Sequence, residues 1–373
     1  MRRLGAAAAL VMCLVGLAPD TVQASTPPLS GLTTSQLAGQ RVIYSYPGLN
    51  PPASLLARIR QGQAAGVIFF GQNIKSHAQI RAVVRRLQAA RLRSPVHAPL
   101  LIMTDQEGGI VKRLSGAPQL SEKQVGASRD NVAAARSAGR GAGLNLRSVG
   151  IDVNLAPVLG VFRTPGDFLD QFQRSFSSNP FTVSRLAPAF VSAQQRTGVA
   201  ATAKHFPGLG AATANQNTDL GPVTLPLSLS TLRNVDMRPY PPTIAAGVRL
   251  VMASWAVYPA LDPNRPSGLS TRIIQGQLRG RLGFKGVTIT DAIEAGALQR
   301  FGSIANRTVL AARAGMDVLL FSKKEVGEGN QGLGALTNAL RSGKLGRAAF
   351  QASVERILAL RQALASGRAL PAP

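Results

Sequence analysis

Charged side chains stand at the ends of three apolar, β-rich runs of this sequence. They are Asp105, the neighbours Lys204 and His205, and Asp291. A carboxylate can act as a nucleophile or exchange a proton, and basic side chains can hold hydroxyl groups beside it. An Asp that follows a strand also commonly caps the next helix, so one such residue has an equally good structural explanation. Several of them converging at one place favour a reaction site.

The elements that must position these residues alternate along the chain. Eight short apolar runs are expected to be strands: Arg41–Tyr46, Gly66–Phe70, Pro99–Thr104, Ile151–Ala156, Val199–Ala203, Arg249–Ala253, Gly286–Thr290 and Met316–Phe321. Stretches with helical spacing lie between them, among them His77–Arg93, Asn131–Val149, Val183–Thr197 and Ser303–Ala314. Continuous apolar runs are typical of buried parallel strands covered by helices. Eight such units predict an α/β fold, a single-domain (β/α)₈ TIM-type barrel, in preference to an open doubly wound sheet.

In such a barrel the active site forms where the strands end. We therefore expect the four charged residues above to meet at one mouth of the barrel. Asp152 and Asp317 precede or begin their strands, so we expect them at the opposite face in structural roles. The stretch Val354–Ala365 is expected to be a terminal helix on the barrel exterior.

Composition excludes several kinds of site. The chain has 373 residues, a single cysteine (Cys13) and three scattered histidines, which excludes a disulfide framework, thiolate-bound metal and a simple His-cluster zinc site. The glycines of Gly139–Gly143 lie inside a helical stretch and no phosphate-binding loop is present, so we expect no cofactor. The net charge of +25 could attract anionic cell-wall polymers. Because the arginines are dispersed, with few aromatics among them, we expect no nucleic-acid binding.

The first residues resemble an export signal. Arg2 and Arg3 precede the apolar stretch Leu4–Ala18, and Val22-Gln-Ala24 offers a cleavage site before Ser25. Cleavage predicts an extracellular, periplasmic or cell-wall-associated protein, and an uncleaved membrane anchor is the alternative. The expected organisation is a signal peptide at 1–24, a leader at 25–31, one barrel domain at 32–366 and a tail at 367–373.

Longer motifs occur in a fixed order along the chain. They are Asp105-Gln-Glu-Gly-Gly109, Arg174-Ser-Phe176, Lys204-His-Phe-Pro-Gly208, Val251-Met252, Leu282-Gly-Phe-Lys-Gly286 and Thr290-Asp291. In type and order they resemble glycoside hydrolase family 3, in particular its single-domain β-N-acetylhexosaminidases, from about residue 32 to residue 363. The resemblance implies a barrel, in agreement with the strand pattern, a carbohydrate substrate such as a cell-wall glycan, and a monomer.

The resemblance also implies roles for individual residues. Asp291 matches the family's nucleophile, which forms a covalent glycosyl-enzyme in a retaining mechanism. Five further residues match those that hold the sugar in the terminal pocket: Asp105, Arg113, Arg174, Lys204 and His205.

One departure from the family pattern concerns the acid/base. The family's hexosaminidases carry an Asp-Ser-His triplet on the loop after Lys-His-Phe-Pro-Gly, whereas this chain has Asn215-Gln-Asn217. An amide cannot transfer the proton, a step that typically contributes about 10²–10⁴-fold in rate. A preceding family His is Leu209, and the family Arg after Gly109 is Ile110.

Three hypotheses follow from this departure. Asp219, two residues beyond the triplet, could supply the acid/base. The protein could instead act only on substrates with good leaving groups or on transfers that need no strong acid. It could also be a sugar-binding relative that no longer catalyses, and a polyanion-binding cell-wall protein is a more distant alternative.

Other polar and aromatic residues have less specific interpretations. Trp255, the single tryptophan, lies at a strand end, where it could stack on a sugar ring or be a core-edge aromatic. Glu107 is expected to orient backbone within its loop, and Glu294 to be a charge in the first turn of a helix. His77 and His97 are expected on the surface.

Overall fold

The computed structural model describes residues 29–365 and residue 370 of the chain. The predicted signal peptide and its cleavage site lie outside the described residues, as do most of the predicted leader and tail. None of the described helices combines the length and apolarity needed to cross a bilayer.

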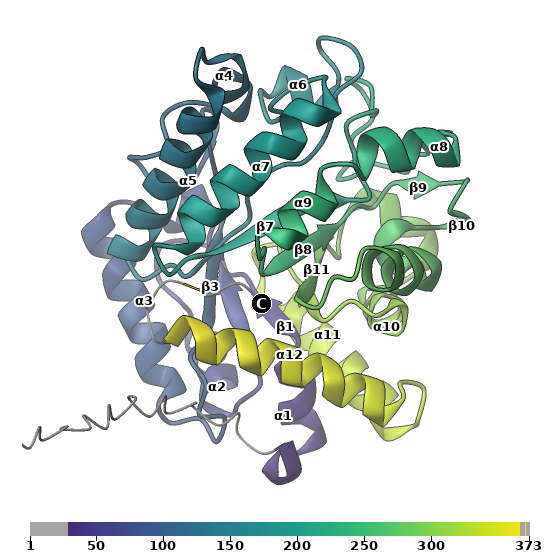
Figure 1. The fold of residues 1–373 in the computed structure, drawn as a ribbon. Helices are drawn as coiled ribbons and strands as arrows, with labels where there is room; N and C mark the ends of the chain where they lie inside the picture. Colours follow the sequence, from purple (N-terminus) through teal and green to yellow (C-terminus); the bar gives the residue numbers. More distant parts are fainter. Residues whose placement is uncertain (1–28, 366–369, 371–373) are drawn as a thin grey trace, which may run out of the picture.

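Eight parallel strands close a barrel within the described part of the chain (Figure 1). They follow one another around the barrel in chain order, and β1 pairs with both β2 and β12. The strands are β1 Val42–Tyr44, β2 Gly66–Ile68, β3 Leu101–Thr104, β6 Val153–Asn154, β7 Ala200–Phe206, β8 Leu250–Ala253, β11 Val287–Ala292 and β12 Val318–Leu320. Each coincides with one of the eight predicted apolar runs, so the barrel prediction is confirmed.

The apolar runs are continuous because both faces of the barrel wall are buried. In β3, Leu101 and Met103 point into the barrel and join an interior cluster with residues of the other strands. Leu100 and Ile102 alternate with them and pack against the outer helices. A strand with one solvent-exposed face would instead alternate apolar and polar residues.

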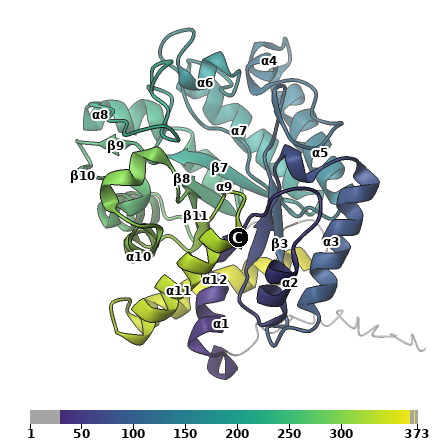
Figure 2. The ribbon, with the colours of Figure 1, turned by 180° about the vertical axis from the view of Figure 1, so that it is seen from behind.

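Helices form a ring around the barrel (Figures 1 and 2). The α-helices are α1 Thr34–Gly39, α2 Ala53–Arg60, α3 His77–Arg91, α4 Glu122–Ala127, α5 Asn131–Ser148, α6 Phe168–Gln171, α7 Pro180–Gln195, α8 Leu229–Thr231, α9 Tyr240–Ala245, α10 Ile304–Ala314, α11 Val326–Arg341 and α12 Arg347–Ala365. The four predicted helical stretches correspond to α3, α5, α7 and α10. Helix α7 begins earlier than predicted, because Asn179 caps it and Pro180 occupies its first turn.

Shorter elements fill the connections. The 3₁₀ helices are η1 Leu29–Gly31, η2 Gly71–Asn73, η4 Ser267–Leu269 and η6 Gly296–Phe301, and the π-helices are η3 Leu232–Asp236 and η5 Arg272–Arg281. Two small antiparallel sheets pair β4 Gln106–Gly108 with β5 Val111–Lys112, and β9 Val257–Tyr258 with β10 Asp262–Pro266.

The terminal helix α12 begins earlier than predicted and occupies a different place. It lies across one end of the barrel, not among the outer ring of helices (Figure 1). Its Ile357, Leu360 and Leu364 belong to the same buried cluster as the barrel interior. Arg361 donates to the carbonyl of Ala98, just before β3, so α12 closes the N-terminal end. The prediction of an exterior position was wrong, because this apolar stripe completes the interior core.

Two aspartates at the N-terminal end have structural partners, as predicted. Asp317 is fully buried and forms ion pairs with Arg279 and Arg356, at 2.6 and 2.7 Å. Asp152 accepts the backbone N–H of Ile102 at 2.8 Å, which ties β3 to the start of β6. Both aspartates are therefore engaged in structural contacts at the N-terminal end of the barrel.

Candidate active site

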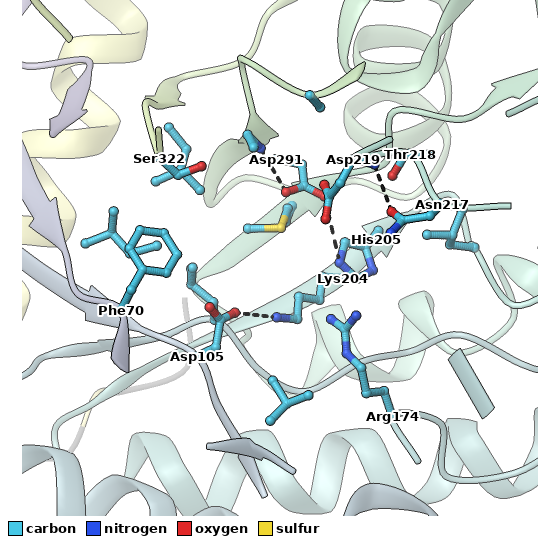
Figure 3. A pocket seen from close by; sticks show the side chains of 18 of the residues that line it. Phe70, Asp105, Arg174, Lys204, His205, Asn217, Thr218, Asp219, Asp291 and Ser322 are labelled. Atoms are coloured by element: carbon cyan, nitrogen blue, oxygen red, sulfur yellow. Dashed lines mark hydrogen bonds and ion pairs between the residues drawn. The ribbon is translucent and has the colours of Figure 1, made fainter. Parts of the chain in front are cut away.

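A cavity of about 330 Å³ opens at the C-terminal ends of the strands (Figure 3). Strands β7 and β11 extend beyond the predicted runs, so Lys204, His205 and Asp291 belong to the strands instead of following them. Seven residues selected from the sequence line this cavity: Asp105, Arg113, Arg174, Lys204, His205, Asp219 and Asp291. The predicted convergence at one mouth is therefore present in the fold.

Lys204 and Arg174 share a buried carboxylate. Lys204 Nζ lies 2.8 Å from Asp105 Oδ1 and 2.7 Å from Glu107 Oε1. Arg174 donates to both oxygens of Glu107, each at 2.9 Å. Burial favours the neutral form of Glu107, but the charges of Arg174 and Lys204 outweigh it and lower its pKa to about 2. Glu107 therefore fixes the direction of both cations.

The expected role of Glu107 as a backbone-orienting loop residue was wrong. The side chain is 2% exposed and binds two cations of the pocket. The hairpin of β4 and β5 turns the chain back directly after it, with Gly108 and Gly109 both at positive φ. The sequence signal available was its place in the motif Asp105-Gln-Glu-Gly-Gly109, between a strand end and two glycines.

Asp291 lies at the centre of the site, 22% exposed in its side chain. Its Oδ1 accepts the backbone N–H of Ala292 at 2.8 Å, and its Oδ2 lies 4.0 Å from His205 Nε2. Burial, and then the nearby cations Arg174 and Lys204, hold the pKa of His205 well below its ordinary value. The imidazole is therefore neutral at pH 7. It provides no positive charge to pair with the carboxyl of Asp291.

The loop after β7 presents Asp219 to the cavity. Asn217 Oδ1 accepts the backbone N–H of Asp219 at 2.9 Å, and the carbonyl of Asn217 accepts from Leu220 and Gly221. The carbonyl of Asp219 accepts from Gly296 at 2.8 Å, which joins this loop to the segment after β11. An Asn at position 217 therefore forms the turn that holds Asp219.

Asp219 and Asp291 form a pair of interacting carboxyl groups. Figure 3 shows both on the same side of the pocket, next to His205. Burial raises the pKa of Asp219 against the opposing charge of Arg174. Burial, and then the charge of Asp219, raise the pKa of Asp291 to about 7. Both shifts favour the protonated form, and ionisation of one carboxyl disfavours ionisation of the other, so the site can provide one acid and one carboxylate together.

Glu294 was also interpreted wrongly from the sequence. It precedes η6 and lines the cavity, where its Oε1 accepts the hydroxyl of Ser322 at 2.7 Å. Its charge also raises the pKa of buried Glu328, after burial itself, to about 8. No helix begins at Glu294, so the expected first-turn role does not apply.

Trp255 does not line the cavity. Its ring is 1% exposed, and its Nε1 donates to the carbonyl of Ala292 at 2.8 Å. Stacking on a sugar is therefore excluded, and the residue instead supports the backbone beside Asp291. His77 contacts Asn145 on the outer ring and His97 is exposed, so both lie away from the site. Among the described residues, no cluster of His, Cys, Asp or Glu is suited to hold a metal ion.

Comparisons with known proteins agree on one family. Residues 34–360 match the glycosyl hydrolase family 3 N-terminal domain. An uncharacterized secreted glycosyl hydrolase of the fungus Arthroderma benhamiae is 45% identical over 91% of this chain and 96% of its own length. A β-hexosaminidase of Xylella fastidiosa is 35% identical over 72% of this chain and 79% of its own.

Solved structures show the same barrel. A family 3 β-N-acetylglucosaminidase from Paenibacillus superposes with a TM-score of 0.84 and 34% identity, over 90% of this chain and 63% of that one. A β-N-acetylhexosaminidase from Beutenbergia cavernae gives 0.79 and 30%, over 89% and 99%. The chain thus spans less than two thirds of the Paenibacillus protein and nearly all of the Beutenbergia protein. With its family model, relatives and barrel in agreement, this chain belongs to glycoside hydrolase family 3.

Proposed function

We propose that this glycosidase removes terminal β-linked N-acetylhexosamine residues from glycans by a retaining mechanism. Asp291 is the nucleophile and Asp219 is the general acid and base. The observation that carries the proposal is the pair itself: two carboxyls in one cavity whose pKa values are both raised, on a barrel whose relatives include β-hexosaminidases. We infer the identity of the cleaved sugar and its linkage from those relatives, and we infer the reaction mechanism from the carboxyl pair.

In the first step a carboxylate oxygen of Asp291 attacks the anomeric carbon as the bond to the leaving oxygen breaks. Asp219 gives its proton to that oxygen, so the leaving group departs as a neutral alcohol. The product is a glycosyl ester of Asp291. Loss of the proton leaves Asp219 ionised at the moment when Asp291 loses its charge, so the two negative charges never coincide in the cavity.

In the second step Asp219 takes a proton from water, and the resulting nucleophile attacks the anomeric carbon. The ester bond to Asp291 breaks, and the sugar is released with its original configuration. Asp219 is then protonated again and Asp291 is again a carboxylate, as the first step requires.

The remaining charges of the pocket hold the sugar. Asp105 Oδ1 is bound by Lys204, which leaves its other oxygen for a sugar hydroxyl. Arg113, Arg174 and His205 line the same cavity and supply donors. Because Glu107 fixes two of the cations in advance, little rotamer freedom remains to be lost on binding.

Two variants test the proposal against a matched control. Asp291→Ala should abolish turnover of a dinitrophenyl N-acetylglucosaminide, since the nucleophile is gone. Asp219→Asn should leave formation of the glycosyl-enzyme from that activated substrate nearly unchanged, but slow a substrate with a poor leaving group by about 10²-fold or more. Glu355→Gln, an exposed change on α12, should match wild type with both.

Each alternative gives a different result. An Asp219→Asn variant that behaves like wild type for every leaving group makes Asp219 a plain loop residue. Wild-type rates that depend steeply on the leaving group show that the acid has been lost without replacement. Binding of free sugar with no turnover of any glycoside shows a binding-only relative.

Export is the proposed location. The proposal rests on Arg2, Arg3, the apolar stretch after them and a relative described as secreted. The mass of the mature N-terminus in the native host tests it: a chain beginning at Ser25 agrees, and an intact Met1 on a cytosolic protein does not.

A further inference from the structure

A second cavity, of about 370 Å³, lies at the end of the barrel opposite the active site. It is enclosed by η5, the end of α10, the connection from α11 to α12, and the first turns of α12. No part of the proposed mechanism uses it.

Cations dominate the lining of this cavity. Those in the described part of the chain are Arg41, Arg279, Arg313, Lys344 and Arg356. The carboxylate that forms ion pairs with this group is Asp317. Its Oδ2 binds Arg279 and its Oδ1 binds Arg356, while Thr288 also donates to Oδ2, so Asp317 is fully engaged. One negative charge among five positive charges leaves a strong excess of positive charge.

Arg41 is buried beside this cavity and, among the described residues, forms no ion pair. It is 2% exposed, and its guanidinium donates to the backbone carbonyls of Asp317 and Met316 at 3.0 and 2.6 Å. The guanidinium also lies over the ring of Phe350, 4.3 Å from the ring centroid. Burial lowers its pKa to about 10, and Arg356 adds to the effect, although Asp317 opposes it. Burying a cation against neutral carbonyls is costly unless an anion completes the site.

The start of α12 adds to the positive field. Gly346, Ala349 and Phe350 line the cavity at the N-terminal end of this 19-residue helix. The first turn of the helix contains no acidic residue. The free N–H groups and the positive end of the helix dipole therefore add to the arginines, as in anion sites at helix N-termini.

We propose that this cavity binds the phosphate group of a phosphate-bearing ligand. Planar guanidinium groups match the oxygens of phosphate in paired hydrogen bonds, and a doubly charged anion suits several cations at once. The apolar side chains of Leu345, Phe350 and neighbouring alanines form walls for the uncharged part of the ligand. A small phosphate ester and a repeating phosphodiester polymer both carry the anionic phosphate group that this cavity would bind.

Binding to the full chain at fixed ionic strength tests the proposal. The probes are inorganic phosphate, glycerol phosphate and inorganic polyphosphate, measured by calorimetry. The test variant is Arg313→Gln/Lys344→Gln, two exposed cations of the cavity that do not bind Asp317. The control is Lys75→Gln/Arg136→Gln, which removes the same charge from exposed positions elsewhere.

We expect saturable binding of phosphate by wild type and control, weakened about tenfold or more in the test variant, the scale of lost charge-assisted hydrogen bonds. Hydrolase activity should be equal in all three proteins, which shows that they are folded. Equal weakening in test and control variants, or no saturable binding of any probe, would overturn the proposal. Tighter binding of polyphosphate than of glycerol phosphate identifies the ligand class as a polymer. Equal binding of the two identifies it as a small phosphate ester.

Discussion

Glu107 gives the sharpest prediction about the stability of the active site. The substitution Glu107→Gln keeps the shape of the side chain but removes the negative charge that Arg174 and Lys204 share. Lys204 keeps its ion pair with Asp105, whereas Arg174 loses its direct carboxylate partner. Removing one partner of a buried pair typically costs about 3–5 kcal/mol.

The pH dependence of this contribution follows from the pKa of Glu107. A carboxyl whose pKa falls from 4.5 when unfolded to about 2 when folded contributes roughly 3 kcal/mol at pH 7. Because the folded pKa is the lower one, the contribution is complete above about pH 4.5 and is lost as the pH falls through 2. By the same relation about half of this contribution remains at pH 3.

Urea unfolding of wild type and variant at pH 7 and pH 3 measures the effect. We expect Glu107→Gln to be less stable by about 3 kcal/mol at pH 7 and by about half as much at pH 3. The control Glu355→Gln, at an exposed position, should stay within about 0.5 kcal/mol of wild type. A Glu107→Gln effect no larger than the control, or one that is equal at the two pH values, would refute the reasoning.

Three further predictions concern the loop, the barrel end and the carboxyl pair. Gly296→Ala places a methyl group against the carbonyl of Leu220, so kcat/KM should fall by up to about 10²-fold, whereas Gly334→Ala, in open space on α11, should not change it. Asp317→Asn should lower the free energy of unfolding by about 3–5 kcal/mol with KM unchanged, since it lies at the opposite end. The wild-type kcat/KM for a poor leaving group should fall above about pH 7, as the pair loses its last proton, and Asp219→Asn assayed with a dinitrophenyl glycoside should lack this fall. A basic limb that persists in that variant would contradict the pairing.

The barrel could be predicted because its signal is local. Each strand is buried on both faces, so its residues form one continuous apolar run, and the count of eight runs indicates closure. The place of α12 could not be predicted in the same way. Its apolar stripe indicates a buried face, but nothing in the spacing says that this face meets the barrel interior.

The residues of the site also differ in whether the local sequence could predict their roles. Asp105, Lys204 and Asp291 were found because each stands at the end of an apolar run. The role of Glu107 depends on partners far away in the sequence, and only the folded hairpin brings it to Arg174. For such contacts the sequence contains no periodic signal.

Trapping the glycosyl-enzyme tests the assignment of Asp291 and Asp219 most directly. The Asp219→Ala variant is mixed with a dinitrophenyl N-acetylglucosaminide and quenched in acid, and its peptides are weighed by mass spectrometry. The leaving group departs without an acid, while water attacks slowly without a base, so the intermediate should accumulate. We predict one N-acetylhexosaminyl residue attached to the peptide at Asp291. Release of the phenol with no attached sugar, or a sugar attached at any other residue, would contradict the account.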